Sequence, residues 1–341
     1  MIKAYIDTIT AGNCLDLLKR LPDNSVAMVF ADPPFNLKKK YGKYNDHLKN
    51  QEYLDWCKIW ILELVRITRP TGSIFLHNIP KWLIRYSHFL DDVASFKHWI
   101  AWDAQTAPMG KTLQPNHYGI LFYAKNSEKL IFNELRYPHK RTRQTNMLAK
   151  DYGGKKYLLH PYGPLISDVW TDIHRIKHSK YRDTHPCQLP IHLLERLILM
   201  ATNENDIVLD PFVGTGTTAI AAKKLGRHYI GFDIDNDYVD ITKDKLKNVE
   251  SNSKIGNSWV SFYLDEIVTL RDRDWNDIKQ YFYIPTKIQY IDKFPIILKH
   301  GPKNIPNYCA KKNEMDDLFL FEEKKKFKTI KKFVKIIEQK K

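Results

Sequence analysis

Two short segments of the chain hold the residue types on which chemistry could depend. The first reads VFADPPFNLKKKY at 29–41 and places Pro33 and Pro34 between Asp32 and Phe35. Because proline cannot continue a helix or a central strand, the apolar run stops there, and the stiff turn fixes the carboxylate relative to the ring. Such a turn suits a flat, polar molecule beside an anionic one. Three lysines follow almost at once: Lys38, Lys39 and Lys40.

The second segment is a glycine loop inside VLDPFVGTGTTAIAAKKLGRHYIGFDID at 208–235. Gly214, Gly216 and Ala219 imitate the dinucleotide fingerprint G-x-G-x-x-A, and Asp233 closes the next predicted strand, where such folds place an acid for a ribose. Glycines in a tight turn between a strand and a helix are also common without any ligand. The loop alone leaves both interpretations open.

The residues before the glycines favour a cationic ligand. Asp210 and Phe212 stand at the lip of the loop, and a carboxylate there would repel the pyrophosphate of a dinucleotide. S-adenosylmethionine has no phosphate but carries an ammonium, a sulfonium and a ribose diol. Asp210 suits its cationic end, the glycines allow close approach of the backbone, and Asp233 can accept hydrogen bonds from both ribose hydroxyls.

Strands and helices alternate around both segments. A short apolar run at 25–33 predicts a buried strand, residues 51–69 show helical spacing, and SIFLHN at 73–78 predicts a second strand. A second block, from about residue 189, predicts a helix, a strand, the glycine loop, a helix and another strand. We therefore predict an α/β fold with a doubly wound, mostly parallel sheet.

The composition is that of a large basic protein. The 341 residues are 43% hydrophobic, and a net charge of +15 favours nucleic acid or another anionic partner, although a solvated lysine-rich surface would give the same charge. No apolar run approaches the roughly 18 residues of a membrane span, and the N-terminal segment lacks the long apolar stretch of a signal peptide. We expect reduced thiols and a cytoplasmic protein, because the four cysteines are far apart. They are Cys14, Cys57, Cys187 and Cys309.

Two motifs and their order resemble those of a known family. DPPF at 32–35 and DPFVGTGTT at 210–218 are similar to the motifs of amino-group DNA methyltransferases of bacterial restriction–modification systems. The catalytic motif precedes the cofactor motif, which is the order of the β class of that family. HPCQLPIHLLERLI is similar to the HPTQKP segment of this class, from which Cys187 and Leu189 depart. The resemblance covers about residues 6–250 outside the variable middle segment.

The resemblance implies a Rossmann-like enzyme that moves a methyl group from S-adenosylmethionine to a base of double-stranded DNA. The target base must rotate out of the duplex, so that Phe35 stacks on it while Asp32 and the Pro33 carbonyl hold its amino group. The implied catalytic residues are Asp32, Pro33, Pro34 and Phe35. The implied cofactor residues are Asp210, Phe212, Gly214, Gly216, Thr217 and Asp233. In this family DPP(Y/F) goes mostly with adenine N6 methylation, and the N4-cytosine reaction is the alternative.

The resemblance also divides the chain. Residues 1–99 would form the catalytic half, 186–250 the cofactor half, and 100–185, rich in basic and aromatic residues, the target-recognition region. Residues 251–341 form a basic C-terminal extension of uncertain role. DNA contacts are expected from Lys38, Lys39, Lys40, Arg141, Arg143, Arg175 and Arg182. A cognate restriction endonuclease encoded nearby and a second copy of the chain are the other expected partners.

Other functions stay open on the residues alone. A nicotinamide-dependent oxidoreductase would use the glycine loop but leave DPPF and the basic middle region unexplained. A DNA-binding protein without activity, or a methyltransferase acting on RNA or protein, would keep both motifs. The stretch HRIKHSKYRDTH suggests a metal through His174, His178 and His185, but it lacks cysteine or carboxylate partners at zinc spacing, so no metal is expected.

Overall fold

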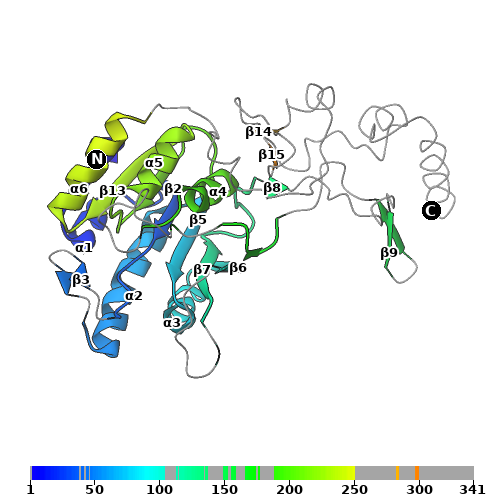
Figure 1. Ribbon diagram of the computed structural model, residues 1–341, viewed down its shortest axis with the longest axis horizontal. Helices are drawn as coiled ribbons and strands as arrows, with labels where there is room; N and C mark the ends of the chain where they lie inside the picture. Colours follow the sequence, from blue (N-terminus) through cyan, green and yellow to red (C-terminus); the bar gives the residue numbers. More distant parts are fainter. Residues whose placement is uncertain are drawn as a thin grey trace. The chain divides into compact units, whose positions relative to one another are not determined.

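The fold is that of a computed structural model (Figure 1). The chain divides into two compact units, one of residues 1–132 with 167–255 and one of residues 133–166 with 256–341. The first unit contains the main sheet. The residues that the structure describes are 2–37, 40–41, 44–45, 47–103, 113, 115–133, 135–136, 149–152, 155–158, 166–173, 176, 188–249, 282–283 and 296–298.

The main sheet has eight strands in the order β1-β13-β12-β2-β5-β7-β6-β11. In that order they are β1 Thr8–Ala11, β13 His228–Asp233, β12 Ile207–Asp210, β2 Val26–Ala31, β5 Thr68–Asn78, β7 His117–Ala124, β6 Ser95–Asp103 and β11 Val169–Trp170. From β1 to β5 all neighbours pair in parallel, β7 pairs antiparallel with β5 and β6, and β11 is parallel to β6. The predicted α/β fold with a mostly parallel sheet is confirmed.

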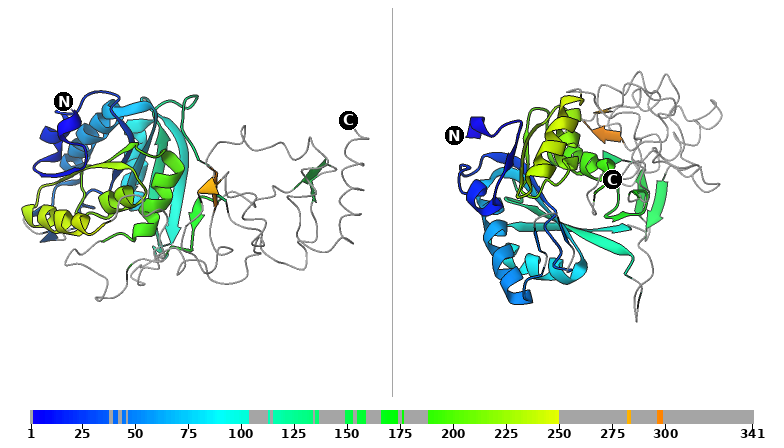
Figure 2. Two further views of the ribbon diagram at one scale, coloured as in Figure 1. Left: turned by 90° about the horizontal axis from the view of Figure 1, so that it is seen from above. Right: turned by 60° about the vertical axis from the view of Figure 1, so that its left-hand side comes forward.

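Helices cover both faces of this sheet (Figure 2). They are α1 Cys14–Leu18, α2 Asn50–Ile67, α3 Pro80–Leu90, α4 Ile191–Ala201, α5 Thr217–Lys224 and α6 Asn236–Lys247, with a 3-10 helix η1 at Ile2–Ala4. Helix α2 contacts α1 and α3, whereas α5 contacts α4 and α6, so the helices form two groups. A parallel strand with helices on both sides is expected to be apolar throughout, and all six residues of β2 are buried.

Helix α2 is amphipathic, as its spacing predicts. Its buried residues include Tyr53, Cys57, Trp60, Ile61 and Leu64, which recur every three or four positions and belong to the main apolar core. The helix ends directly at β5, with which it also packs. This arrangement fixes the first turns of α2 close to the loop that follows β2.

The remaining described strands form small sheets. β3 Lys40–Tyr41 pairs with β4 Tyr44–Asn45, β9 Ala149–Tyr152 pairs with β10 Lys155–Leu158, and β15 Ile296–Leu298 lies between β14 Phe282–Tyr283 and β8 Leu135–Arg136. Among the described helices, none combines the length and the apolar composition that a membrane crossing requires.

The main sheet includes part of residues 100–185, a segment whose composition did not predict strands. The weak periodicity of residues 100–185 predicts a long irregular stretch, yet residues 100–124 include the end of β6 and all of β7, which form an antiparallel pair within the sheet. The strand β7 is buried from Gly119 to Ala124, so its apolar run outweighs the polar composition around it. The helical spacing of Phe327, Ile330, Val334 and Ile337 predicts an amphipathic helix over 327–337, and these residues lie outside the described part of the chain.

Candidate active site

The carboxyl ends of three parallel strands meet at one edge of the main sheet. Asp32 follows β2, and Asp210 and Asp233 close β12 and β13. β12 and β2 are neighbours at which the order reverses, because β13 continues the sheet on one side and β5 on the other. Such a switch point is where open α/β sheets bind their ligands.

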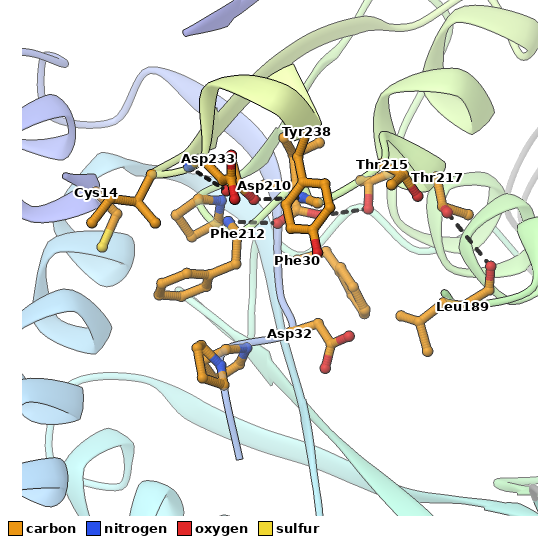
Figure 3. A pocket seen from close by; sticks show the side chains of 18 of the residues that line it. Cys14, Phe30, Asp32, Leu189, Asp210, Phe212, Thr215, Thr217, Asp233 and Tyr238 are labelled. Atoms are coloured by element: carbon orange, nitrogen blue, oxygen red, sulfur yellow. Dashed lines mark hydrogen bonds between the residues drawn. The ribbon is translucent and has the colours of Figure 1, made fainter. Parts of the chain in front are cut away.

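A cavity of about 230 Å³ lies at this edge. Figure 3 shows Asp32 on one side of it and Asp210 with Asp233 on the other. Two motifs that are far apart in the sequence therefore line one site. Of the predicted catalytic and cofactor residues, Gly216 alone does not line it. The predicted residues on its wall are Asp32, Pro33, Pro34, Phe35, Asp210, Phe212, Gly214, Thr217 and Asp233.

The glycine loop turns sharply between β12 and α5. Gly214 and Gly216 have φ angles of 52° and 90°, in the left-handed region that favours glycine. A Cβ atom on Gly216 would lie 2.4 Å from Thr242 Cγ2 of α6, so this position needs glycine for packing as well as for the turn. Gly216 therefore shapes the loop from behind the cavity wall.

Two carboxylates brace the glycine loop. Asp233 accepts the Gly214 N–H at 2.9 Å. Asp210 accepts the Phe212 N–H at 2.9 Å and the Thr218 hydroxyl at 2.5 Å, and it is only 3% exposed. An ionised carboxylate accepts about four hydrogen bonds, so both side chains retain capacity for a ligand.

The electrostatics of the cavity favour a positively charged ligand. Burial raises the pKa of Asp210 from 3.8 to about 7; hydrogen bonds from Thr218 and Phe212 oppose the rise, and the charges of Asp32 and Asp233 add to it. Burial also raises the pKa of Asp233. Among the described residues, no lysine, arginine or histidine lines this cavity. The side chains that line the cavity in the described part of the chain therefore supply no positive charge to offset these carboxylates.

The DPPF loop is held from beneath by buried side chains. The Tyr53 hydroxyl donates to the Pro34 carbonyl at 2.6 Å, and Trp82 Nε1 donates to the Phe35 carbonyl at 2.7 Å. Tyr53 and Trp82 come from α2 and α3 and are buried. The Pro33 carbonyl, in contrast, accepts no hydrogen bond from any described residue.

The Asp32 carboxylate contacts a buried histidine. His77 Nδ1 lies 2.7 Å from Asp32 Oδ1, and the two side chains are 2% and 17% exposed. Phe35 is 8% exposed, with its ring centroid 5.6 Å from that of His77 and 5.8 Å from that of Tyr118. The Phe35 ring thus has little free surface.

Sequence reasoning missed the residues that support the site. The supporting residues are Tyr53, His77 and Trp82, together with Trp56, whose ring lies 5.6 Å from that of Phe212 on the cavity wall. A signal for His77 was present, because it is a polar residue near the end of an apolar strand, as Asp32 is. The indole and phenol groups carried no such signal, since aromatic residues at helical spacing are typical of any core.

No side chain predicted to contact DNA is among the side chains that the structure describes. Lys40 belongs to β3, but its side chain is not described. The other predicted contacts lie outside the described residues: Lys38, Lys39, Arg141, Arg143, Arg175 and Arg182. The three histidines considered for a metal, His174, His178 and His185, also lie outside them.

Two family models of DNA methyltransferases match the chain. Residues 26–244, more than half of the chain, match the family model described as DNA methylase, which covers N6 and N4 enzymes. Residues 192–335 match the D12 class of N6 adenine-specific DNA methyltransferases.

The chain is also similar to individual DNA methyltransferases. It is 41% identical over 260 residues to the Type II methyltransferase M.BamHI of Bacillus amyloliquefaciens, a match that covers 74% of this chain and 61% of M.BamHI. It is 35% identical over 244 residues to the Type II methyltransferase M.HpaI of Haemophilus parainfluenzae, covering 70% of this chain and 73% of M.HpaI. The match thus spans less than two thirds of M.BamHI.

A solved structure shares the fold. The PvuII DNA methyltransferase (cytosine-N4-specific) has a TM-score of 0.52 and 18% sequence identity, over 74% of this chain and 89% of that one. At this identity the likeness concerns the fold alone. The family match, however, spans both motifs of the cavity, and on that ground the chain belongs to the N6/N4 DNA methylase family.

Proposed function

We propose that this DNA methylase transfers a methyl group from S-adenosylmethionine to the exocyclic N6 amino group of an adenine rotated out of duplex DNA. The observation that carries the proposal is a single cavity lined by both the DPPF loop and the glycine loop. The D12 match over residues 192–335 supports adenine. The N4-cytosine reaction is the alternative, because both bases present an amino group beside a ring nitrogen.

The glycine-loop side of the cavity fits S-adenosylmethionine. When bound, this cofactor supplies a methyl group on a positively charged sulfur. Asp233 accepts hydrogen bonds from its ribose hydroxyls, Asp210 favours its cationic end, and Gly214 allows close approach of the backbone, with Phe212 and Thr217 as the adjoining wall. Among the described residues that line this side, a pyrophosphate would meet two carboxylates and no basic side chain, which argues against a nicotinamide-dependent oxidoreductase.

The DPPF side of the cavity fits an amino group. The lone pair of this nitrogen is conjugated with the base, so the nitrogen is a poor nucleophile. Hydrogen bonds from the amino group to Asp32 and to the Pro33 carbonyl hold the nitrogen closer to tetrahedral and free the lone pair. The Pro34 and Phe35 carbonyls already accept hydrogen bonds, whereas the Pro33 carbonyl accepts none from a described residue and can receive the amino group. Positioning then supplies the larger part of catalysis.

Phe35 replaces part of the stacking that the base loses when it leaves the duplex. Stacking of a base on an aromatic side chain contributes on the order of 1–3 kcal/mol. Because the ring of Phe35 now packs beside His77 and Tyr118, the base competes with these neighbours for its surface.

The basic segments supply the DNA contacts in this proposal. Lys38, Lys39 and Lys40 neutralise phosphates beside the cavity, and residues 100–185 read the target sequence, with the arginines as candidate base readers: Arg141, Arg143, Arg175 and Arg182. The name Type II methyltransferase of the relatives supports a cognate restriction endonuclease as partner. A homodimer and a cytoplasmic location complete the proposal.

Incubation with unmethylated bacterial DNA and methyl-labelled S-adenosylmethionine tests this function. The DNA is digested to nucleosides and analysed by mass spectrometry, with Asp32→Ala as the control. We expect label in N6-methyladenine with the parent protein and none with the variant. Label in N4-methylcytosine would overturn the choice of base, and unlabelled DNA would overturn the proposal.

A further inference from the structure

We propose that His77 is a positioning residue, which holds the Asp32 carboxylate in the orientation that the target amino group requires. The inference rests on the proposed function, because Asp32 there accepts a hydrogen bond from the base. His77 does not line the cavity and so acts through Asp32 alone.

The sheet itself brings the two residues together. β2 and β5 pair in parallel, with Ala31 opposite Leu76, so Asp32 and His77 follow as the next residues on adjacent strands. His77 Nδ1 and Asp32 Oδ1 are 2.7 Å apart, a short distance for a nitrogen and a carboxylate oxygen. The contact therefore joins the catalytic turn to the centre of the sheet.

The second ring nitrogen shows which atom carries the hydrogen. His77 Nε2 is buried and has no hydrogen-bond partner among the described residues. An ionised Asp32 can only accept hydrogen bonds, so His77 must carry a hydrogen on Nδ1 and donate it to Asp32. An imidazolium would bury a second N–H without an acceptor, which is costly, so the neutral ring with its hydrogen on Nδ1 fits best.

Aromatic neighbours keep the imidazole in this orientation. Its centroid lies 6.5 Å from that of Phe30, 5.6 Å from Phe35, 5.8 Å from Trp102 and 5.4 Å from Tyr118. The ring is 2% exposed, so it cannot turn away from Asp32 without displacing these rings.

The contact assigns separate tasks to the two oxygens of Asp32. Oδ1 is occupied by His77, whereas Oδ2 has no hydrogen-bond partner among the described residues. With Oδ1 fixed, the carboxylate cannot rotate freely, and Oδ2 stays available for the amino group. A displacement of about 1 Å in a reacting arrangement can cost about 100-fold in rate, so this restraint matters for turnover.

Three substitutions of His77 separate positioning from packing. His77→Phe keeps a buried ring but removes the donor. His77→Asn can place an amide N–H where Nδ1 lies, whereas His77→Gln places it where Nε2 lies, so the last two variants form a matched pair. Each variant is assayed for methyl transfer at saturating DNA, for S-adenosylmethionine affinity and for thermal unfolding.

We expect kcat to fall about 10- to 100-fold in His77→Phe and His77→Gln. His77→Asn should stay within about threefold of the parent, and cofactor affinity should change less than about twofold in all three. Parent-like turnover in His77→Phe, or an equal loss in His77→Asn and His77→Gln, would overturn the proposal.

NMR of ¹⁵N-histidine-labelled protein gives a readout that needs no turnover. We expect His77 to carry its hydrogen on Nδ1 in the parent and to shift toward the Nε2–H tautomer in Asp32→Ala. A parent His77 with its hydrogen on Nε2 would overturn the proposal. If the parent transferred no methyl group to DNA, the proposed function would fail, yet this measurement would still decide the role of the His77–Asp32 contact.

Discussion

Replacing Asp210 with asparagine should separate stability from cofactor binding. Burial raises the Asp210 pKa from 3.8 to about 7, so the folded protein holds a proton that the unfolded chain releases above about pH 4. Asp210 therefore lowers the free energy of unfolding by an amount that grows as the pH rises from about 4 to 7 and stays constant above pH 7. A shift of about 3 units, at 1.36 kcal/mol per unit, amounts to about 4 kcal/mol at pH 8.

Asparagine removes this cost but also removes one acceptor. Its side chain offers one oxygen, so it loses either the hydrogen bond from the Phe212 N–H or the one from the Thr218 hydroxyl, at about 1–2 kcal/mol. We expect Asp210→Asn to exceed the parent in stability by about 2 kcal/mol at pH 8. At pH 5.5 only about half of the charge cost is present, so the difference should shrink to about 1 kcal/mol or less.

Urea unfolding at both pH values measures the difference, provided that the m-value is unchanged. In the same variant, S-adenosylmethionine should bind at least about tenfold more weakly at pH 8, because its cationic end has lost a carboxylate partner. Asp92→Asn, at an exposed position after α3, is the matched control and should change neither quantity. A variant less stable than the parent at pH 8, or equally stabilised at both pH values, would refute the reasoning.

The same geometry makes two further predictions. Cofactor affinity should weaken by nearly tenfold per pH unit below about pH 7, because Asp210 takes up a proton there. Calorimetry in buffers of different ionisation enthalpy should detect proton release on cofactor binding. A constant affinity from pH 8 to 6 would contradict this. Gly216→Ala should lower the free energy of unfolding by about 2–4 kcal/mol, because its Cβ would meet Thr242 at a φ of 90°. Adding Thr242→Ser should recover part of that loss, because it removes the Thr242 Cγ2 methyl group with which the new Cβ would clash. If no stability is recovered, backbone strain alone causes the loss.

The sequence predicted the fold well where apolar periodicity and turn residues agreed. The strand before Asp32, the helix α2 and the block from α4 to β13 all formed close to their predicted bounds. Asp32, Asp210 and Asp233 each close or follow a buried strand, and parallel strands bring such ends together. That rule is enough to place both motifs at one edge of the sheet.

What the sequence did not reveal depends on side chains that meet only through tertiary packing. Tyr53 and Trp82 look like core residues in their own helices, and their hydrogen bonds to the DPPF loop arise only because α2 and α3 pack beneath it. Gly216 matched a ligand-binding pattern, yet its closest neighbour is Thr242 on α6. The composition of residues 100–185 also gave a wrong prediction at β7, because basic and aromatic residues surround the apolar run that forms this strand of the main sheet.

We expect the one cavity to hold two separable sites, a base site at Asp32 and a cofactor site at Asp233. The most direct test measures S-adenosylmethionine affinity and methyl transfer to DNA on the same preparations of Asp32→Ala and Asp233→Ala. Asp32→Ala should abolish transfer and leave the cofactor Kd within about twofold. Asp233→Ala should raise that Kd about 10- to 100-fold, with transfer recovering at high cofactor concentration. Equal loss of cofactor binding in both variants would contradict the division of roles.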